Sequence, residues 1–188
     1  MPALPGDLFE AQEELLDAAV ASLDYLEGFG LLGAPARRGI VPPGELVIDC
    51  DQVVVLSGSV GEIPTRPTGG GTAPGQKHRI YGRITGVTLN VAVSRCCIPI
   101  GTTNGQKYSP PTMAELQAAS EQLNADGWAL WNGIFSRLVA QDFEFFTKCN
   151  QVAWEAMTPL GPRGACAGWL VTLRAQLPGY LEPIGSGS

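Results

Sequence analysis

The feature that most constrains the fold of this chain is a run of alternating side chains at residues 87–94, VTLNVAVS. One set is large and apolar: Val87, Leu89, Val91 and Val93. The other set is small and at most weakly polar: Thr88, Asn90, Ala92 and Ser94. Alternation with a period of two indicates a β-strand with one buried face, and we predict this strand over 79–98. Because its second face carries no charge, we predict that this face is a contact or lining surface.

Two amphipathic helices are predicted to cover the sheet. Apolar residues recur at helical spacing over 6–28 and again over 112–141. In the second helix, Thr112 and Glu115 have the spacing of a capping box. Its predicted buried stripe consists of Met113, Leu116, Ser120, Leu123, Gly127, Leu130, Ile134 and Leu138, widened by Trp128, Trp131 and Phe135. Gly127 is expected to kink this helix or to let another element approach it closely.

Three further strands complete the predicted sheet. The first covers 45–57, where apolar residues occupy both faces, so we expect burial on both sides. The others cover 150–157 and 165–175 and form a hairpin through a Gly-Pro turn. The predicted class is α+β, with a mixed or antiparallel sheet of about four strands packed against an N-terminal helix and one long central helix.

Long loops and a tail are predicted to connect these elements within one domain over 1–188. The chain contains 24 glycines and 15 prolines, many of them between the predicted elements. Residues 58–78 are expected to form a mobile loop, 99–111 a second loop and 176–188 a loose tail. A loop as long as 58–78 is usually functional or becomes ordered by a partner.

The low and acidic charge of the chain limits its partners. Only 16% of the residues are charged, and the formal net charge is −6. An acidic chain is poorly suited to hold DNA phosphates, so we do not predict a protein that grips nucleic acid. Sparse charge is typical of a surface that other copies or partners cover.

Targeting signals are not recognised in the sequence. No apolar run approaches the ~18 residues of a transmembrane helix, and the N-terminus lacks the basic region and apolar core of a signal peptide. We therefore expect residence in a cytoplasm, where thiols stay reduced. The cysteines are predicted to be small buried hydrophobic residues, not metal ligands: Cys50, Cys96, Cys97, Cys149 and Cys166.

Each segment that resembles a catalytic or phosphate-binding motif lacks an essential residue or element. The segment GGGTAPGQK has Gln76 where a phosphate-binding loop needs lysine. Ser59 lies in a near-match to a nucleophile elbow, but no helix is predicted after it. The single histidine, His78, has no recognisable catalytic partner. The glycines before residue 169 are followed by a predicted strand, whereas a phosphate-binding loop must be followed by a helix. We predict no catalytic residue, no cofactor and no metal site, and therefore no enzyme.

The order of five segments resembles one protein family. These segments are LPGDLFEAQEELLDAAVASLD, CDQVVVLSGSVGEIP, VTLNVAVSRCCIPI, PPTMAELQAASEQLNADGWALWNGI and VAWEAMTPLGPRGACAGWLVTL. Over residues 4–175 the order is similar to tail-terminator and head-to-tail connector proteins of long-tailed phages that infect actinobacteria. The strongest signals are Cys50 at the first strand, SRCCIP after the alternating strand, and Gly-Pro-x-Gly-x-x-x-Gly-Trp in the closing hairpin. The family commonly has Pro-Glu-Gly-Gly in that turn, whereas Pro162 is followed here by Arg-Gly-Ala.

This resemblance implies a structural virion protein at the tail–neck junction, assembled in the host cytoplasm. Its copies would form a ring, typically of six, that caps the tail tube, ends tube polymerisation and contacts the tail tube protein and a neck or stopper protein. DNA would pass through the lumen without specific binding, and no membrane is involved. The candidate contact residues lie in two loops, 58–78 and 99–110: Glu62, Arg66, Gly70, Lys77, Asn104, Gln106 and Lys107.

Two other interpretations remain open at this stage. Another neck connector of the same virion would share the ring and the DNA passage. A small cytoplasmic enzyme or ligand-binding domain would instead use the loop around His78. A further hypothesis is that residues 58–78 become ordered only on assembly.

Overall fold

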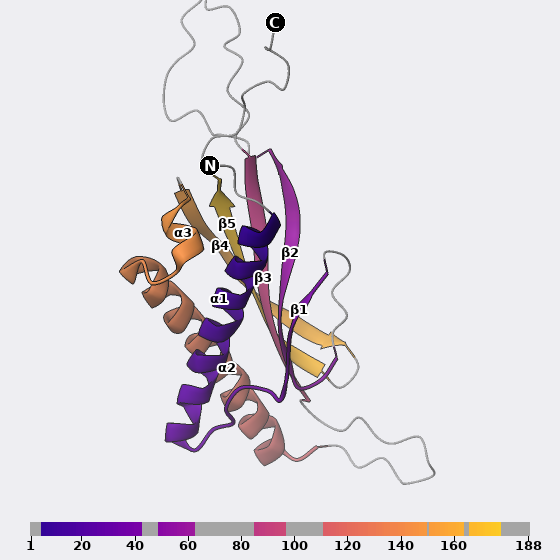
Figure 1. Ribbon diagram of the computed structural model, residues 1–188. Coiled ribbons are helices and arrows are strands. Elements are labelled where there is room, and N and C mark those ends of the chain that lie inside the picture. The colour runs from indigo at the N-terminus through magenta and orange to yellow at the C-terminus, as the bar shows by residue number, and fades with distance from the viewer. Residues whose placement is uncertain are drawn as a thin grey trace, which may run out of the picture.

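The strand with the alternating sequence, β3 (Thr85–Cys96), is the middle strand of a five-stranded sheet in the order β1-β2-β3-β5-β4 (Figure 1). β1 (Arg37–Val41) runs parallel to β2 (Gln52–Glu62). The remaining neighbours are antiparallel, including the hairpin of β4 (Gln151–Arg163) and β5 (Cys166–Gln176). This computed structural model describes residues 5–42, 49–62, 85–96, 111–149, 151–163 and 166–177.

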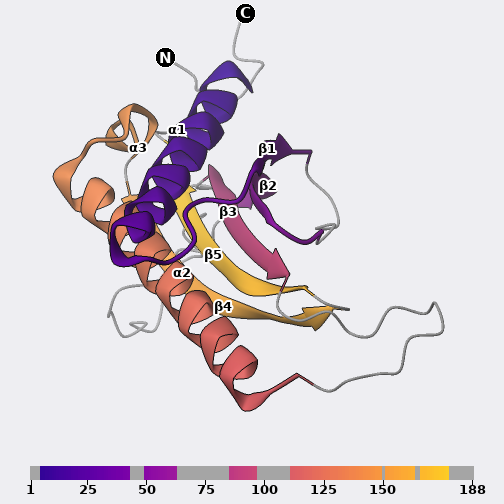
Figure 2. The ribbon, with the colours of Figure 1, turned by 90° about the horizontal axis from the view of Figure 1, so that it is seen from below.

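A layer of helices covers one face of the sheet (Figures 1 and 2). α1 (Pro5–Asp24) continues into a short 3-10 helix, η1 (Tyr25–Phe29), and contacts β2 and β3. α2 (Met113–Ala140) packs beside α1 and against β5, and α3 (Glu144–Thr147) follows it. The predicted α+β class and the mixed sheet are confirmed.

The core lies between the helical layer and the sheet. The four apolar residues of the alternating run in β3 are each at most 1% exposed. Their partners are fully buried side chains of the two helices and of β5: Leu15, Leu23, Leu130, Ile134 and Leu173. Burial of a side chain of this size contributes about 1.5–3 kcal/mol, so this interface dominates the stability of the domain.

Several strand boundaries differ from the sequence prediction. β1 was not predicted, because its sequence, RRGIV, does not alternate between apolar and polar residues. Its place in the sheet comes from its pairing with β2. β2 begins at Gln52 and continues to Glu62, so the first residues of the predicted loop 58–78 belong to a strand. A bulge between Ser57 and Val60 lets β2 continue along β3. The rest of that loop, the loop 99–110 and most of the tail 176–188 lie outside the described residues.

The closing hairpin is longer than predicted. β4 runs through Gly161 and Pro162 to Arg163, so the predicted Gly-Pro turn is wrong over these residues. Proline fits there because β4 is an edge strand, whose outward N–H groups are not needed for pairing.

The capping box of α2 is confirmed. The backbone N–H of Glu115 donates to Thr112 Oγ1 over 3.3 Å, and the N–H of Thr112 donates to Glu115 Oε2 over 2.7 Å. The bonds that Thr112 donates to the Glu115 carboxylate, from its N–H and from its hydroxyl, lower the pKa of that carboxyl.

The predicted buried stripe of α2 is only half right. Gly127, Leu130 and Ile134 are buried, but Met113 is 79% and Leu116 38% exposed, and Ser120 is exposed as well. Toward the end of this half of the helix, Gln122 bonds to Leu32, and the carbonyl of Leu123 accepts from Trp169. Trp128 and Phe135 are also exposed, at 65% and 45%. Phe135 keeps one edge against Trp154 of β4, with the ring centroids 6.3 Å apart.

Candidate functional site

The predicted lining face of β3 lies on the side of the sheet opposite to the helices. Thr88 and Asn90 are half-buried, and Thr172 of β5 donates to Asn90 Oδ1 over 2.9 Å. Ala92 and Ser94 are only 3% and 2% exposed. The structure therefore brings all four residues onto one face, but only the half around Thr88 and Asn90 remains accessible.

A second apolar cluster explains this burial. It contains Val54 and Leu56 of β2 and Ala92 of β3, with Val41, Leu160 and Leu170 packed around them. The predicted burial of β2 on both faces is thus confirmed.

The predicted contact residues of the loops are hardly tested by the structure. Glu62 is the last residue of β2. The others lie outside the described residues: Arg66, Gly70, Lys77, Asn104, Gln106 and Lys107.

A disulfide joins Cys50 to Cys166, so the prediction of reduced thiols is wrong for these two residues. They are 116 residues apart in sequence, and the sheet brings their Cα atoms within 5.2 Å. Cys96 is exposed, contrary to its predicted burial, whereas Cys97 lies outside the described residues. Cys149 is half-buried, and burial raises the pKa of its thiol to about 11, which keeps it neutral and consistent with the predicted apolar role.

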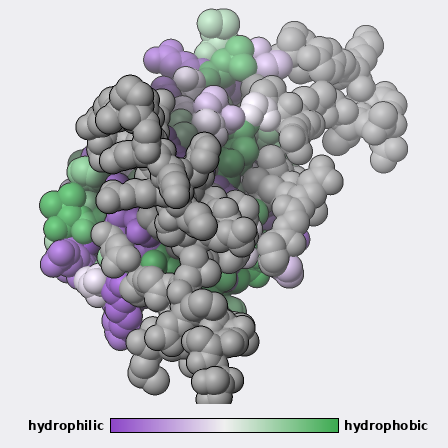
Figure 3. Space-filling model, turned by 90° about the horizontal axis from the view of Figure 1, so that it is seen from above, coloured by the Kyte–Doolittle hydropathy of each residue, from purple (hydrophilic) through white to green (hydrophobic). Residues whose placement is uncertain are grey.

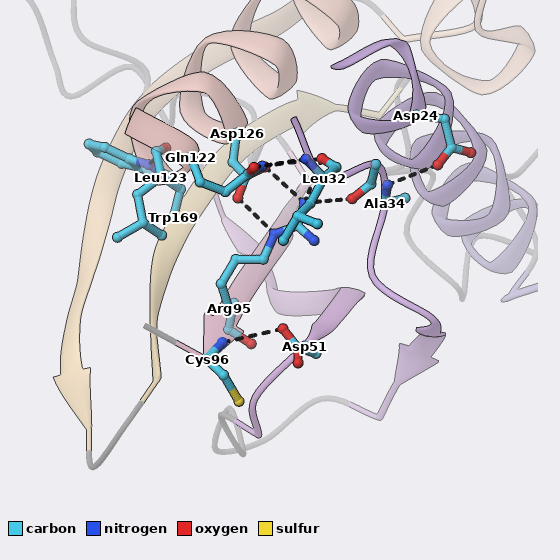
Figure 4. A network of polar contacts seen from close by, with 12 residues as sticks. Asp24, Leu32, Ala34, Asp51, Arg95, Cys96, Gln122, Leu123, Asp126 and Trp169 are labelled. Carbon is cyan, nitrogen blue, oxygen red and sulfur yellow. Dashed lines mark hydrogen bonds and ion pairs between the residues drawn. The ribbon is translucent and has the colours of Figure 1, made fainter. Parts of the chain in front are cut away.

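A buried ion pair fastens β3 to α2 (Figure 4). Arg95 donates from Nε to Asp126 Oδ2 and from Nη2 to Asp126 Oδ1, each over 2.9 Å. The two side chains are 7% and 0% exposed. Arg95 Nη2 also donates to the carbonyl oxygen of Gly33 over 2.6 Å, which ties in the loop after η1.

Gln122 completes this network. Its Nε2 donates to Asp126 Oδ1 over 2.9 Å and to the Leu32 carbonyl over 3.1 Å, and its Oε1 accepts from the Leu32 N–H over 2.8 Å. The Arg95–Asp126 pair is buried, whereas the bonds between Gln122 and Leu32 lie at the surface. The groups satisfy one another, so the network acts as a structural brace. Arg95 continues the alternation of Val87, Leu89, Val91 and Val93 and therefore lies on the buried face of β3. This pattern could have predicted an inward-pointing arginine that pairs with a buried acid.

The close approach predicted at Gly127 is confirmed, and its partner is Trp169 of β5. A Cβ atom on Gly127 would lie 2.9 Å from the indole ring. The Trp169 Nε1–H donates to the carbonyl oxygen of Leu123 over 2.6 Å. The missing side chain at residue 127 therefore allows the indole to lie against α2 and to reach its backbone.

Many large apolar side chains are exposed on the helices and on the segment after η1. They are Phe9, Tyr25, Phe29, Leu32, Met113, Leu116, Trp128, Phe135 and Val139. Trp128, Phe135 and Val139 recur at helical spacing and form one stripe on α2. In Figure 3, apolar groups appear at the surface as separate green patches beside purple, hydrophilic groups.

An apolar groove lies between η1 and α2 within this surface. Its volume is about 460 Å³, Tyr25 and Trp128 line it, and no lining side chain is charged. Beside it the two long helices approach closely, because a Cβ atom on Gly133 would overlap Ser22 Oγ. We call the groove together with the exposed stripe of α2 the outer helical surface.

Two other hollows are smaller. One of about 340 Å³ lies beneath α3 and is lined by Phe146, Cys149 and Trp154, among others. The other, of about 360 Å³, separates the first half of α2 from the tip of the hairpin. Neither has a charged lining residue.

The structure shows no nucleophile elbow at Ser59, because β2 continues through this residue to Glu62. His78 lies outside the described residues. Among the described residues, no three His, Cys, Asp or Glu side chains gather as a metal site. None of the described helices is long and apolar enough to cross a membrane.

No protein-family model matches the chain, and no curated protein matches it significantly.

Proposed function

We propose that this protein is a structural protein of a phage virion, a tail terminator whose copies form a ring on the end of the tail tube. The ring, of six copies, ends tube polymerisation and joins the tail to the neck proteins while DNA passes through its lumen. The observation that carries the self-assembly in this proposal is the outer helical surface. The assignment to a phage tail rests on the order of the sequence segments.

The outer helical surface supports self-assembly because its apolar groups are not needed for the core. Trp128 is 65% exposed although the core beneath α2 is closed by Leu130 and Ile134. A large exposed apolar surface on a soluble domain usually marks an interaction site. If an interface covers ~100 Å² of the Trp128 ring, the contribution is about 2.5 kcal/mol per contact.

Two further properties agree with a virion protein through which DNA passes. A disulfide such as that of Cys50 and Cys166 persists once a particle has left the reducing cytoplasm. The net charge of −6 disfavours adhesion of DNA phosphates to the ring.

Native mass spectrometry over a range of protein concentrations tests the ring. We expect a discrete closed oligomer, and we expect Trp128→Ala to weaken it while thermal unfolding of the monomer is unchanged, since the side chain is mostly exposed. A monomer at every concentration, or one that turns over a small molecule, would contradict the proposal.

A second assay separates the terminator from another neck connector. The protein is added to tail tube protein while tubes grow, and tube lengths are measured by electron microscopy. A terminator shortens the tubes and is found at their ends. A connector leaves tube length unchanged and instead binds the neck protein.

A further inference from the structure

The charges of this chain are segregated along its sequence. Residues 1–36 contain seven acidic residues and no lysine or arginine: Asp7, Glu10, Glu13, Glu14, Asp17, Asp24 and Glu27. Between Glu62 and Glu115 there is no acidic residue, but there are six basic ones: Arg66, Lys77, Arg79, Arg83, Arg95 and Lys107. The N-terminal helix and the segment after β2 are therefore oppositely charged.

Three acidic residues of α1 form an exposed stripe on the helix that leads to the groove. Glu10, Glu13 and Asp17 are exposed and recur at spacings of three and four residues, which places them on one side of the helix. Among the described residues, no cation pairs with any of the three. Two further steps of four residues, through Ala21, lead from Asp17 to Tyr25. Tyr25 lines the groove.

The segment 77–83, KHRIYGR, has the complementary chemistry. Its cations, Lys77, Arg79 and Arg83, flank the apolar side chains of Ile80 and Tyr81. Its apolar residues suit an uncharged groove between aromatic walls, and its cations suit the acidic stripe on the helix that leads to that groove.

We propose that the groove and the acidic stripe of α1 bind the basic segment 77–83 of a second copy of this chain. This inference rests on the proposed ring and assigns one of its subunit contacts. The contact is head-to-tail, since it joins two different surfaces, and a repeated head-to-tail contact forms a ring when the rotation between copies closes.

The geometry favours a neighbouring copy over the same chain. β2 ends and β3 begins at the end of the domain where α1 starts, whereas η1 lies at the other end (Figure 1). α1 has 20 residues and is therefore ~30 Å long. Tyr81 is four residues from Thr85, which limits its reach to ~14 Å from the start of β3. Tyr81 thus falls short of the groove in its own domain, so filling the groove requires the segment of a neighbouring copy.

Charge reversal tests this contact in the full-length protein. Asp17→Lys is compared with Asp142→Lys, which makes the same charge change at an exposed residue after α2. We expect Asp17→Lys to raise the subunit dissociation constant about tenfold, because an attraction becomes a repulsion. Asp142→Lys should leave it unchanged, and raising the salt concentration should weaken the wild-type ring.

Rescue identifies the partner surface. Arg79→Glu alone should also weaken assembly, and an equimolar mixture of Asp17→Lys and Arg79→Glu chains should recover part of it through the matched contact. Native mass spectrometry reads out the oligomers in each sample.

The outcomes separate this inference from the proposed function. A wild-type ring that is unaffected by Asp17→Lys, or weakened equally by Asp142→Lys, overturns the contact and leaves the ring standing. The contact is also overturned if Asp17→Lys changes only the unfolding of dilute monomer, which would indicate binding within one chain. A wild-type protein that never assembles contradicts the proposed function itself.

Discussion

Removal of the buried carboxylate of Asp126 should cost more stability than removal of any exposed acid. In Asp126→Ala, the Arg95 side chain, which is 7% exposed in the wild type, loses two hydrogen bonds of 2.9 Å. It keeps the carbonyls of Gly33 and Leu32, which carry no full charge. Breaking a buried pair in this way costs about 3–5 kcal/mol, a large part of the roughly 5–15 kcal/mol that holds a domain folded.

Urea denaturation followed by circular dichroism measures this loss. The matched control is Asp24→Ala, because Asp24 pairs with Arg38 at 3.6 Å and both side chains are more than 40% exposed. Asp24 also accepts the Ala34 N–H over 2.8 Å, so the control should lose only about 1–2 kcal/mol.

A second variant separates loss of the pair from loss of packing. Arg95→Met combined with Asp126→Leu removes both charges and fills similar space, so most of the stability should return. The reasoning is refuted if Asp126→Ala unfolds within about 1 kcal/mol of the wild type, or if the double variant is no better than the single one.

Three further predictions concern packing, the disulfide and the buried thiol. Gly127→Ala should destabilise the fold by about 1–3 kcal/mol in thermal unfolding, because its Cβ would meet Trp169 at 2.9 Å. Cys50→Ser should cost about 2–5 kcal/mol, since the bond to Cys166 closes a long loop, and a reductant should lower the melting temperature of the wild type but not of the variant. Cys149 should resist alkylation at pH 8 and react as the pH approaches its pKa of about 11, with mass spectrometry as the readout.

Each of these predictions has a control. Gly28→Ala should cost nothing, because no atom lies within 4 Å of a Cβ at that residue; equal loss in both glycine variants would contradict the packing explanation. Cys96 is exposed and serves as the reference thiol for alkylation. Equal rates of alkylation at Cys96 and Cys149 in the folded protein would show that burial does not protect Cys149.

Local patterns predicted the parts of the fold that local forces determine. The alternation around Val91 and the capping box at Thr112 each depend on side chains a few residues apart, and both are found as expected. β1 has no such pattern, because Arg37–Val41 becomes a strand only through its parallel pairing with β2. The register of a parallel strand pair is not determined by residues that are close in sequence.

The sites that sequence reasoning missed depend on long-range register. Cys50 and Cys166 meet because β5 lies beside β3 in the sheet. The spacing of residues in the sequence does not show that these two strands are neighbours. Arg95 could have been placed on the core face from its parity. Its acceptor, Asp126, becomes identifiable only once α2 is placed over β5.

The wrong predictions on α2 have one physical cause. Hydrophobic periodicity reports that a helix face is covered, but it does not report which chain covers it. Met113, Leu116 and Trp128 were predicted to be buried and are exposed in the single chain. In the proposed ring, Trp128 would be covered by a neighbouring copy, so its side chain would be buried as predicted, against another subunit. The same reasoning makes Trp128 a better test of assembly than of folding: its loss should change the oligomer and leave the monomer stable.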